Sequence, residues 1–551
     1  MHTGGSAVPV VVVGAGPVGQ SAALLLARWG IDVVVLDARP ARDLIGSKAL
    51  CQQRDVLDIW DSVGVGRQVA DEGVTWTTSR TYYRDQQLFC VEFVDRGRSP
   101  FPPWVNVSQS RTEALLDERI AAEPRIDVRW GHAVRDLTQD ADGVTLQVAT
   151  PAGPRQLRAQ WVLAATGVKD DGLRAALGLT FAGRSFSDRF LICDIRADLP
   201  GWERERRFYF DPEWNRGRQV LIHPCPDSTF RIDWQVPADY DLADDAASGS
   251  LDRRIRAIVG GRDYEVVWQS AYRFHSRHVE RMRVGRVLLA GDVAHVVAPF
   301  GARGLNGGVQ DAENAAWKLA FVLHGWAPET LLDSYDAERL AAALENLDVT
   351  TATMRFLVPQ DDDERATRLS VLERARTDPS ARPLVNSGRM AEPFWYVDSP
   401  LTTTSPQHDR ASRPPVGQSP VPGPGVLLPD LEVQRPSGPG RIRSLARQGL
   451  LALVAAGSDP VAVVEVLAAQ PVPATVVELG VVDAGGDVAR ALGVLPGEVW
   501  LVRPDAHVAA VVPAGNARDV QAAVDRTLGR DARQTTASDA EETDALLPQR
   551  R

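Results

Sequence analysis

The sequence contains little cysteine, and its distribution excludes two kinds of site. Among 551 residues there are only four cysteines, Cys51, Cys90, Cys193 and Cys225, with no Cys-x-x-Cys pair and no metal-ligand spacing to histidine. We therefore expect neither a disulfide framework nor a metal site. Such cysteine usage is typical of a reducing compartment, so the expected location is the cytoplasm.

Long hydrophobic runs and basic blocks are also absent. No uninterrupted apolar segment is long enough for a transmembrane helix. The formal net charge is -11, and no cluster of basic residues with interleaved aromatics occurs. The alternating charges at residues 203–207 are most simply a solvated face. We expect a soluble protein that binds neither membranes nor nucleic acid.

The N-terminal segment carries a dinucleotide-binding fingerprint. A run of β-branched residues at 10–13 predicts a buried parallel strand, and a helix over 20–29 and a second strand over 33–36 follow. Between the first strand and the helix, Gly14 makes the turn, Gly16 lets the backbone approach a pyrophosphate, and Gly19 allows close helix packing. Asp37, at the end of the second strand, accepts the ribose hydroxyls. FAD and NAD both fit this pattern.

A second glycine-rich segment lies at residues 284–320. A strand over 287–290 ends at Gly291-Asp292, a turn follows, and a helix is expected from about Val309. The glycines assigned to the turn are Gly301, Gly304, Gly307 and Gly308. Such a turn gathers backbone N–H groups at a helix N-terminus, where an anion or an electron-rich ring can be held. Asp292 can accept hydrogen bonds from a sugar-phosphate chain.

The order Gly291-Asp292-x-Ala294-His295, then Pro299-x-Gly301-x-x-Gly304-x-Asn306-x-Gly308-x-x-Asp311-x-x-Asn314, resembles the second flavin motif of the class A flavoprotein monooxygenases, the p-hydroxybenzoate hydroxylase type. The resemblance spans about residues 8–530. It implies an enzyme in which NAD(P)H reduces FAD and O2 adds at flavin C4a. The resulting hydroperoxide hydroxylates a small aromatic substrate, phenolic or polyketide-like. The chain is also compatible with a homodimer.

Two other functions remain open. One is a different flavin oxygenation on the same fold, such as epoxidation or Baeyer–Villiger insertion. The other is a flavin-binding protein without NAD(P)H-driven activity, because residues 165–174 depart from the family pattern. Thr166 stands where aspartate is expected, Lys169 replaces arginine, and one residue is inserted before Arg174. Threonine keeps a hydroxyl but no charge, which leaves NAD(P)H docking open.

The resemblance implies a set of cofactor-binding residues. Asp292 binds the ribityl chain, and Pro299 lies near the reactive face of the flavin. Lys48 lies along the pyrophosphate, and Gln109, at the start of a helix expected near Ser108, contacts the flavin. The pyrimidine ring faces Gly304, Leu305 and Asn306. The remaining residues of the set come from the fingerprint and the segments near it: Gly14, Ala15, Gly16, Pro17, Val18, Gly19, Asp37, Ala38, Arg39 and Val134.

A hairpin over residues 219–223 and 230–236 belongs to a second, β-rich module. Strand alternation places Phe230, Ile232 and Trp234 on one face and Arg231 and Asp233 on the other. By resemblance, this sheet covers the substrate over the flavin. The catalytic candidates are His223, Arg231 and Asp233, which could orient or deprotonate a phenol.

The expected fold class is α/β. A Rossmann-like FAD-binding domain covers residues 1–75, 108–180 and 276–400, and a β-rich substrate domain is inserted at 76–107 and 181–275. A linker rich in Pro, Gly and Ser covers 401–425. Residues 426–530 resemble a thioredoxin-like domain without cysteine, and 531–551 form a disordered tail. For Glu338 and Arg339 we expect a packing and ion-pair role.

Overall fold

The computed structural model describes residues 7–43, 49–93, 99–405, 407–408, 421–435 and 438–530. Lys48, most of the expected linker and the expected tail at 531–551 lie outside these residues. Packing divides the chain into two units. The first unit comprises Met1–Ala316 and Arg339–Glu392, and the second comprises Trp317–Glu338 and Pro393–Arg551.

The first unit contains an eight-stranded sheet in which the chain begins. Its main path is β17 (Arg283–Val284), β18 (Val287–Leu289), β11 (Gly153–Ala164), β1 (Val8–Val13), β2 (Val33–Asp37) and β8 (Ile126–Trp130). The strands β9 (Ala133–Gln139) and β10 (Val144–Thr150) extend it from β11. The central strands are parallel and buried on both faces, as continuous Val and Leu runs predict.

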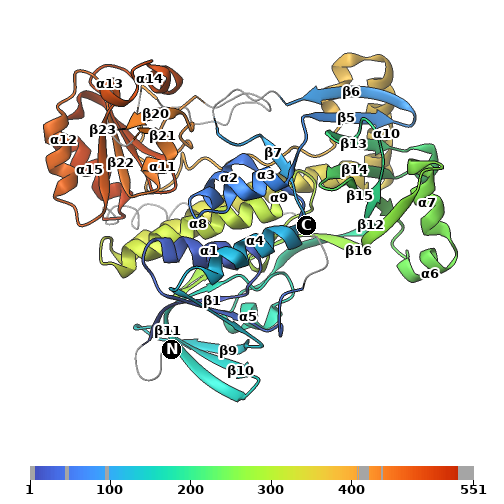
Figure 1. Ribbon diagram of the computed structural model, residues 1–551, viewed down its shortest axis with the longest axis horizontal. Coiled ribbons are helices and arrows are strands. Elements are labelled where there is room, and N and C mark those ends of the chain that lie inside the picture. Colours follow the sequence, from blue (N-terminus) through green and yellow to red (C-terminus); the bar gives the residue numbers. More distant parts are fainter. Residues whose placement is uncertain are drawn as a thin grey trace, which may run out of the picture. The chain divides into compact units, whose positions relative to one another are not determined.

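Two helices of the first unit pack together beside this sheet (Figure 1). The helix α1 (Pro17–Arg28) leaves β1 directly, and α4 (Gln109–Ala121) begins after the Ser108 cap. The Gln20 side-chain amide donates to the Glu113 carbonyl oxygen at 2.9 Å, which joins the two helices. The strand, glycine turn, helix and strand predicted for the fingerprint are all present.

A second eight-stranded sheet stands beside the first within the same unit. Its order is β19 (His295–Val296), β16 (Tyr264–His278), β12 (Ala182–Ala197), β15 (Thr229–Val236), β14 (Gln219–Cys225), β13 (Glu205–Phe210), β5 (Thr78–Tyr83) and β6 (Gln86–Glu92). The long strands β12 and β16 run side by side in Figure 1. The predicted hairpin is confirmed as β14 and β15, which pair antiparallel.

The two faces of this second sheet have different surroundings. Phe230, Ile232 and Trp234 of β15 belong to a core with residues of α7 (Ser250–Val259), which follows α6 (Leu242–Ala247). On the opposite face, Phe208 and Leu221 pack in a core with residues of α10 (Asp362–Thr377). The alternation expected for the hairpin is therefore confirmed.

A three-stranded sheet lies against the second large sheet. It consists of β3 (Cys51–Gln53), β7 (Trp104–Asn106) and β4 (Val74–Thr75), with α2 (Arg54–Asp61) and α3 (Gly66–Glu72) nearby in the chain. The Asn106 amide donates to the Pro224 carbonyl oxygen of β14 at 2.8 Å. This bond fixes the small sheet against the β14–β15 hairpin.

The start of the long helix α8 (Gly304–Leu323) corrects one prediction. We expected a turn through Gly304, Gly307 and Gly308, yet all three are helical. A Cβ atom on Gly308 would lie 2.6 Å from Val18 Cγ2 and 3.3 Å from Gly291 Cα. Gly308 therefore serves close packing of the helix rather than a turn, whereas Gly301, with φ of 95°, does lie in a turn.

The second unit contains a four-stranded sheet. Its order is β23 (Ala474–Glu478), β22 (Leu450–Val454), β24 (Val499–Val502) and β25 (Val508–Val512), with β22 parallel to β23 and the other pairs antiparallel. Helix α12 (Pro460–Ala468) joins the first two strands, and α13 (Leu479–Val482) and α14 (Asp487–Leu492) precede β24. The last described helix is α15 (Ala517–Thr527), and β20 (Glu432–Arg435), β21 (Gly438–Arg441) and α11 (Ile442–Ala446) precede the sheet.

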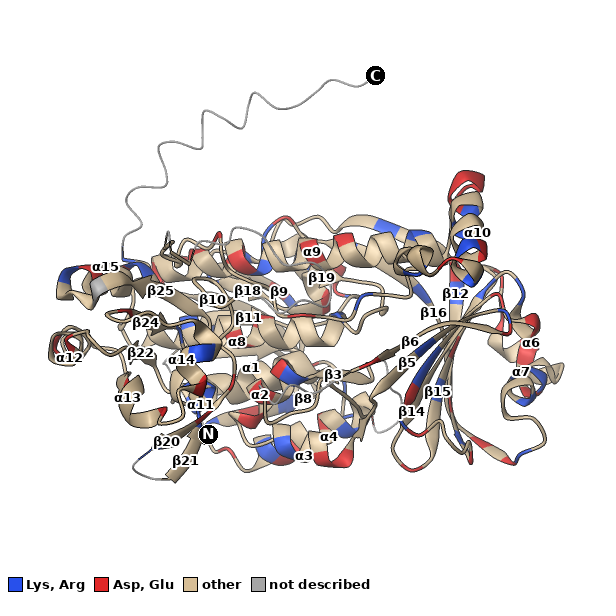
Figure 2. Ribbon diagram, turned by 90° about the horizontal axis from the view of Figure 1, so that it is seen from above, with Lys and Arg blue, Asp and Glu red and all other residues tan. Residues whose placement is uncertain are grey.

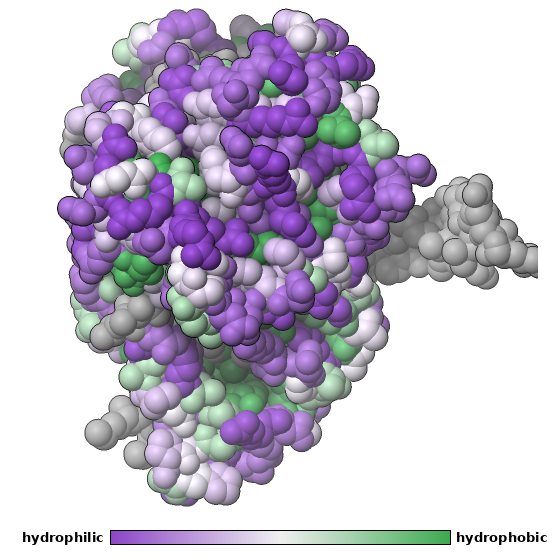
Figure 3. All heavy atoms as spheres, turned by 90° about the vertical axis from the view of Figure 1, so that its right-hand side faces the viewer, coloured by the Kyte–Doolittle hydropathy of each residue, from purple (hydrophilic) through white to green (hydrophobic). Residues whose placement is uncertain are grey.

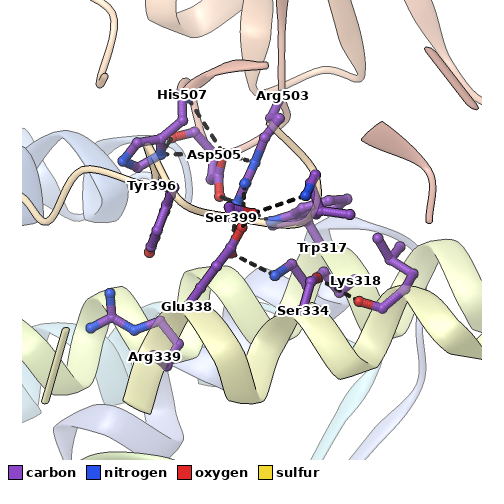
Figure 4. Close-up of polar contacts among 12 residues, drawn as sticks. Trp317, Lys318, Ser334, Glu338, Arg339, Tyr396, Ser399, Arg503, Asp505 and His507 are labelled. Carbon is purple, nitrogen blue, oxygen red and sulfur yellow. Dashed lines mark hydrogen bonds and ion pairs between the residues drawn. The ribbon is translucent and has the colours of Figure 1, made fainter. Parts of the chain in front are cut away.

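A fully buried ion network lies within the second unit (Figure 4). Lys318 Nζ lies 2.7 Å from Glu338 Oε2, and Arg503 binds both Glu338 and Asp505. Lys318 belongs to α8 and Glu338 to α9 (Asp333–Leu357). In the first unit, Arg339 Nε lies 2.6 Å from Asp311 Oδ1. The ion-pair role expected for Glu338 and Arg339 is confirmed.

No helix among the described residues combines the length and the apolar composition needed to cross a bilayer. The face seen in Figure 3 is mostly hydrophilic, and its hydrophobic residues occur in separate small groups.

Candidate active site

The fingerprint loop is shaped by its glycines. A Cβ atom on Gly14 would lie 2.4 Å from the Ala165 carbonyl oxygen, and one on Gly19 would lie 1.9 Å from the Gly14 carbonyl oxygen. At Gly16 no atom lies within 4 Å of the Cβ position. Packing therefore requires glycine at the first two positions. At Gly16 the backbone is open to the approach of another group.

Asp37 holds this loop from the end of β2. Its Oδ2 accepts from the Ala15 backbone N–H at 2.8 Å, and Arg39 donates to both carboxylate oxygens at 3.0 and 2.9 Å. Burial alone would raise the pKa of Asp37, but the hydrogen bonds from Arg39 and Ala15 lower it. Asp37 is thus an ionised acceptor. Ala38 next to it is exposed, and Val134 in β9 is half-buried.

The fingerprint and the second flavin motif meet at Val18. Its side chain would contact a Cβ atom added to either Gly291 or Gly308, at 3.1 and 2.6 Å. Asp292 and Pro299 are exposed, although the residues on either side of each are mostly buried. Both residues therefore reach the surface of the motif.

Asp311 in α8 fixes the turn that carries Asp292. Its Oδ2 accepts from the Gly291 backbone N–H at 2.9 Å and lies 2.7 Å from His295 Nε2. Burial raises the pKa of Asp311, but Arg339 and His295 outweigh burial and bring it to about 2. The buried carboxylate remains charged and anchors the turn.

Asn306 ties the start of α8 to the small sheet. Its amide nitrogen donates to the Cys51 carbonyl oxygen at 2.9 Å, and its oxygen accepts from the Gln53 backbone N–H at 2.9 Å. The side chain is therefore engaged within the protein. Beside it in the sequence, Gly304 and Leu305 are half-buried at the first turn of the helix. The first turn of α8 could contact a flavin ring through its backbone N–H groups.

Gln109 and Thr166 border the same region. Gln109 Oε1 accepts from the Ala49 backbone N–H at 3.0 Å, directly after the segment with Lys48 that the structure does not describe. Thr166 lies beside Gly14, and its buried hydroxyl has no partner among the described residues. Arg174 donates to the Val168 and Val293 carbonyl oxygens at 2.9 and 3.2 Å, which ties the altered segment to the turn at Asp292.

The catalytic candidates belong to a row of polar residues that crosses the second sheet. Strand register aligns Ser79 with Arg206, His223 with Arg231, Arg231 with Asp194, and Asp194 with Trp268. Arg207 pairs with Ile222, so the preceding Arg206 is adjacent to His223. We call these residues the polar row: Ser79, Arg206, His223, Arg231, Asp194 and Trp268. Asp233 lies on the same face, one alternation away.

The three candidates differ in their partners. Arg231 is buried and forms a bidentate pair with Asp194, with both N–O distances at 2.8 Å. His223 Nδ1 and Asp233 Oδ1 are buried atoms without hydrogen-bond partners among the described residues. Arg231 is thus held by a carboxylate, whereas His223 and Asp233 have unused hydrogen-bonding capacity.

Burial sets the protonation of these two groups. It raises the pKa of Asp233 to about 7, and Arg231 and Arg206 only partly oppose it. Burial, together with the positive charges of Arg206 and Arg231, lowers the pKa of His223 well below its usual value. His223 is therefore neutral at pH 7, and Asp233 exchanges its proton near that pH.

Arg206 corrects a second prediction. Residues 203–207 were expected to be solvated, yet only 4% of Arg206 is exposed. The strand β13 alternates, so Arg206, Phe208 and Phe210 point to the buried face. Basic residues occur on several strands of this sheet in Figure 2. The prediction also missed Asp194. Period-two spacing with Phe208 and Phe210 was the signal for Arg206, but the sequence held no signal that joined Asp194 to Arg231.

The residues of the first unit fit FAD. Gly16 leaves a backbone approach open, Asp37 is an ionised acceptor, and the unpartnered Thr166 hydroxyl lies beside the loop. The open sides of the two glycine motifs are brought together by Val18. A cradle of this kind is suited to a dinucleotide cofactor.

Comparison with known families gives the same class. The model of the FAD binding domain family matches residues 7–350, and the model for the C-terminal region of aromatic-ring hydroxylases matches residues 421–531. Because the first match covers more than half of the chain, the chain belongs to the FAD-dependent aromatic-ring hydroxylase family. It is an FAD-dependent monooxygenase.

Individual relatives agree. A flavin-dependent monooxygenase of Mycobacteroides abscessus is 34% identical over 358 residues, which is 62% of this chain and 73% of the relative. The para-nitrophenol 4-monooxygenase of a Pseudomonas species is 30% identical over 379 residues, 67% of this chain and 92% of the relative.

Solved structures show the same fold over nearly the whole chain. The flavin-dependent monooxygenase PieE, in complex with FAD and substrate, superposes with a TM-score of 0.83 at 22% identity, covering 95% of this chain and 99% of that one. Aklavinone-11 hydroxylase with FAD and aklavinone gives a TM-score of 0.77 at 24% identity, covering 96% and 100%. The mixed α/β architecture is therefore shared with these proteins.

Proposed function

We propose that this monooxygenase hydroxylates a phenolic or polyketide-like aromatic ring bound against the polar row, with Asp233 accepting the proton of the ring hydroxyl and the neutral His223 orienting that hydroxyl. The observation that carries the proposal is the pair of buried, unpartnered acceptor atoms, Asp233 Oδ1 and His223 Nδ1, on one sheet face. Relatives named for nitrophenol and for 3-(3-hydroxyphenyl)propionate support a hydroxylated ring.

The fingerprint loop and the turn at Asp292 form the cofactor site in this proposal. Gly14, Gly16 and Gly19 shape the pyrophosphate cradle, Asp37 takes the ribose hydroxyls, and Asp292 takes the ribityl chain. The first turn of α8 faces the flavin ring. The other proposed contacts are Ala15, Pro17, Val18, Ala38, Arg39, Lys48, Gln109, Val134, Pro299, Gly304, Leu305 and Asn306. When bound, FAD would accept a hydride from NAD(P)H and, once reduced, would activate O2.

The protein's own part in the reaction is proton handling and orientation. A phenol whose oxygen lies within hydrogen-bond distance of Asp233 can transfer its proton to the carboxylate, while the neutral imidazole of His223 can hydrogen-bond to the same ring. The ring thereby becomes electron-rich at the carbon that is oxygenated. Arg231 stays paired with Asp194 and limits the movement of this face, and the aromatic core around Phe208 excludes water.

We extend the proposal to the chain's organisation. The first sheet and the helices beside it form the FAD-binding domain, and the second sheet forms the substrate domain. The order β23-β22-β24-β25, with one parallel and two antiparallel pairs, supports a thioredoxin-like C-terminal domain without redox cysteines. A cytoplasmic location and a homodimer complete the proposal.

The test is anaerobic reduction of the purified flavoprotein by NADPH and by NADH, alone and with a panel of phenols, followed by product analysis in air. We expect one phenol to accelerate bleaching of the flavin and to return hydroxylated. The Asp233→Asn variant should lose about 100-fold or more of the hydroxylation rate. Asp227→Asn, in the exposed turn of the same hairpin, is the matched control.

Other results separate the alternatives. A flavin that is bound but not reduced by either nucleotide would favour a protein without NAD(P)H-driven activity, and would point to the segment at Thr166. A lactone or epoxide product would favour another oxygenation. An Asp233→Asn variant with full hydroxylation activity would show that Asp233 is not the proton acceptor.

A further inference from the structure

The polar row contains a buried cation, Arg206, that has no carboxylate within ion-pair distance among the described residues, although the Asp233 carboxyl on the same face interacts with its charge from farther away. We propose that Arg206 binds an oxyanion of the aromatic substrate, which narrows the substrate class to rings that carry a carboxylate or an ionised phenol. This inference rests on the proposed function, because it assigns a second contact within the same substrate face.

The contacts of Arg206 are few and weak for a buried guanidinium. Its Nη1 donates to Ser79 Oγ at 3.3 Å and its Nη2 to the Ser387 carbonyl oxygen at 3.4 Å. Its Nε has no partner, although a guanidinium carries five N–H donors. Both acceptors are neutral, and both distances are longer than the usual 2.9 Å or so.

Arg231 provides an internal comparison. Both arginines are buried in the polar row, at 4% and 3% exposure, but only Arg231 has a carboxylate partner. Burial lowers the pKa of Arg206 to about 10, so the group remains a cation at pH 7. Burying an ion without a partner is among the most costly arrangements in a folded protein. Its presence here is accounted for by an anion that arrives with the substrate.

The neighbours of Arg206 define the rest of the ligand. His223 lies beside it on β14 and is neutral at pH 7, and Asp233 lies on the next strand without an ion pair. Cys51 of β3 also faces Arg206, and burial raises the pKa of its thiol to about 12, so it is uncharged. The face thus offers a cation at one position and unpartnered proton acceptors at another. A ring with an oxyanion and a separate hydroxyl satisfies both.

The test measures ligand binding to the FAD-loaded protein by calorimetry with matched pairs of probes. Benzoate is compared with benzamide, and 4-nitrophenolate with 4-nitroanisole. We expect the wild type to prefer the anion in at least one pair. The Arg206→Met variant should lose that preference by about 10- to 100-fold in Kd, the value of a charge-assisted hydrogen bond. If the wild type prefers only benzoate over benzamide, the bound oxyanion is a carboxylate. If it prefers only 4-nitrophenolate over 4-nitroanisole, the oxyanion is an ionised phenol.

Two further variants make the test specific. Arg206→Lys keeps the charge without the two-pronged geometry and should restore part of the preference. Arg207→Met removes the next arginine, which points to the other face and pairs with Glu205 at 2.8 Å, and should leave the preference intact. Equal loss in Arg207→Met would show a general effect of charge and would overturn the assignment.

Stability without ligand gives an independent readout. Arg206→Met removes an unbalanced buried charge, so it should unfold at the same temperature as the wild type or higher. If Arg206 instead stabilised the fold, its replacement would lower the unfolding temperature. The inference is overturned if the variant is clearly destabilised, or if the wild type binds no anion in preference to its neutral analogue. The proposed function fails separately, if no hydroxylated product forms while anion preference persists.

Discussion

The buried network at Glu338 allows a quantitative prediction. In the second unit, Lys318 and Arg503 supply two positive charges, and Glu338 and Asp505 supply two negative charges, all fully buried (Figure 4). The Glu338→Gln substitution preserves the shape of the side chain and removes one negative charge. An excess buried positive charge then remains among groups that have no access to solvent.

The cost can be worked from two contributions. Burial, opposed by Glu338, holds the pKa of Lys318 at about 8. Without Glu338 the lysine releases its proton at pH 7, which costs about 1.4 kcal/mol for one pKa unit. Weakening the bonds from Arg503 to a charged acceptor costs about 1.5–3 kcal/mol. The expected loss is therefore about 3–4 kcal/mol, in the lower part of the range of about 3–5 kcal/mol for breaking a buried pair.

The measurement is chemical unfolding of the FAD-loaded protein, with hydrogen exchange to locate the change. Protection should fall in β22 and β24 of the second unit. Glu329→Gln, an exposed change nearby in the chain, should stay within about 0.5 kcal/mol of the wild type. The double variant with Lys318→Met should be more stable than Glu338→Gln alone, because it removes the buried amine that has lost its carboxylate partner. A loss below about 1 kcal/mol for the single variant, or no recovery in the double, would refute the reasoning.

Two other predictions concern the first unit. Because the folded protein retains a proton on Asp233 that the unfolded chain loses above pH ~4, the contribution of Asp233 to stability should fall as pH rises from ~4 to about 7, opposite in sign to the contribution of the neutral His223. Asp233→Asn should flatten that pH dependence in denaturant titrations, and Asp227→Asn should not. Gly308→Ala places a methyl group 2.6 Å from Val18 Cγ2 and should cost about 1–3 kcal/mol and lower the flavin content. Gly307→Ala, with 3.5 Å of room, should be tolerated in the same assays.

Much of the fold could be predicted because the strands have unambiguous patterns. Parallel strands buried on both faces appear as continuous apolar runs, which identified β1 and β2. The hairpin of β14 and β15 followed from period-two alternation and a Pro-rich turn. The predicted start of α8 was wrong, because Gly304 and Gly308 suggest a turn when only local preference is considered. Gly308 lets the helix approach Val18 and Gly291, which is a property of the packed structure.

The candidate site had local sequence signals only in its cofactor half, whereas His223, Arg231 and Asp233 were predicted from strand alternation and resemblance. Glycine spacing and an acid about 20 residues later are local signals, so Gly14, Gly19 and Asp37 could be proposed from the sequence. The pair of Arg231 with Asp194 depends on the register of β12 against β15, which joins positions 37 residues apart in the sequence. No local pattern contains that register.

Arg206 shows why charge in a sequence is a poor guide to a site. The strand β13 has charged residues on both faces, and on the outward face Glu205 and Arg207 neutralise each other. Alternation with Phe208 and Phe210 could have placed Arg206 inside, but a buried arginine by itself predicts an ion pair, as Arg231 demonstrates. The two arginines differ only in whether the neighbouring strand provides a carboxylate. What suggests a binding role for Arg206 is that no carboxylate is hydrogen-bonded to it, and this can be seen only once the strands of the sheet are placed side by side.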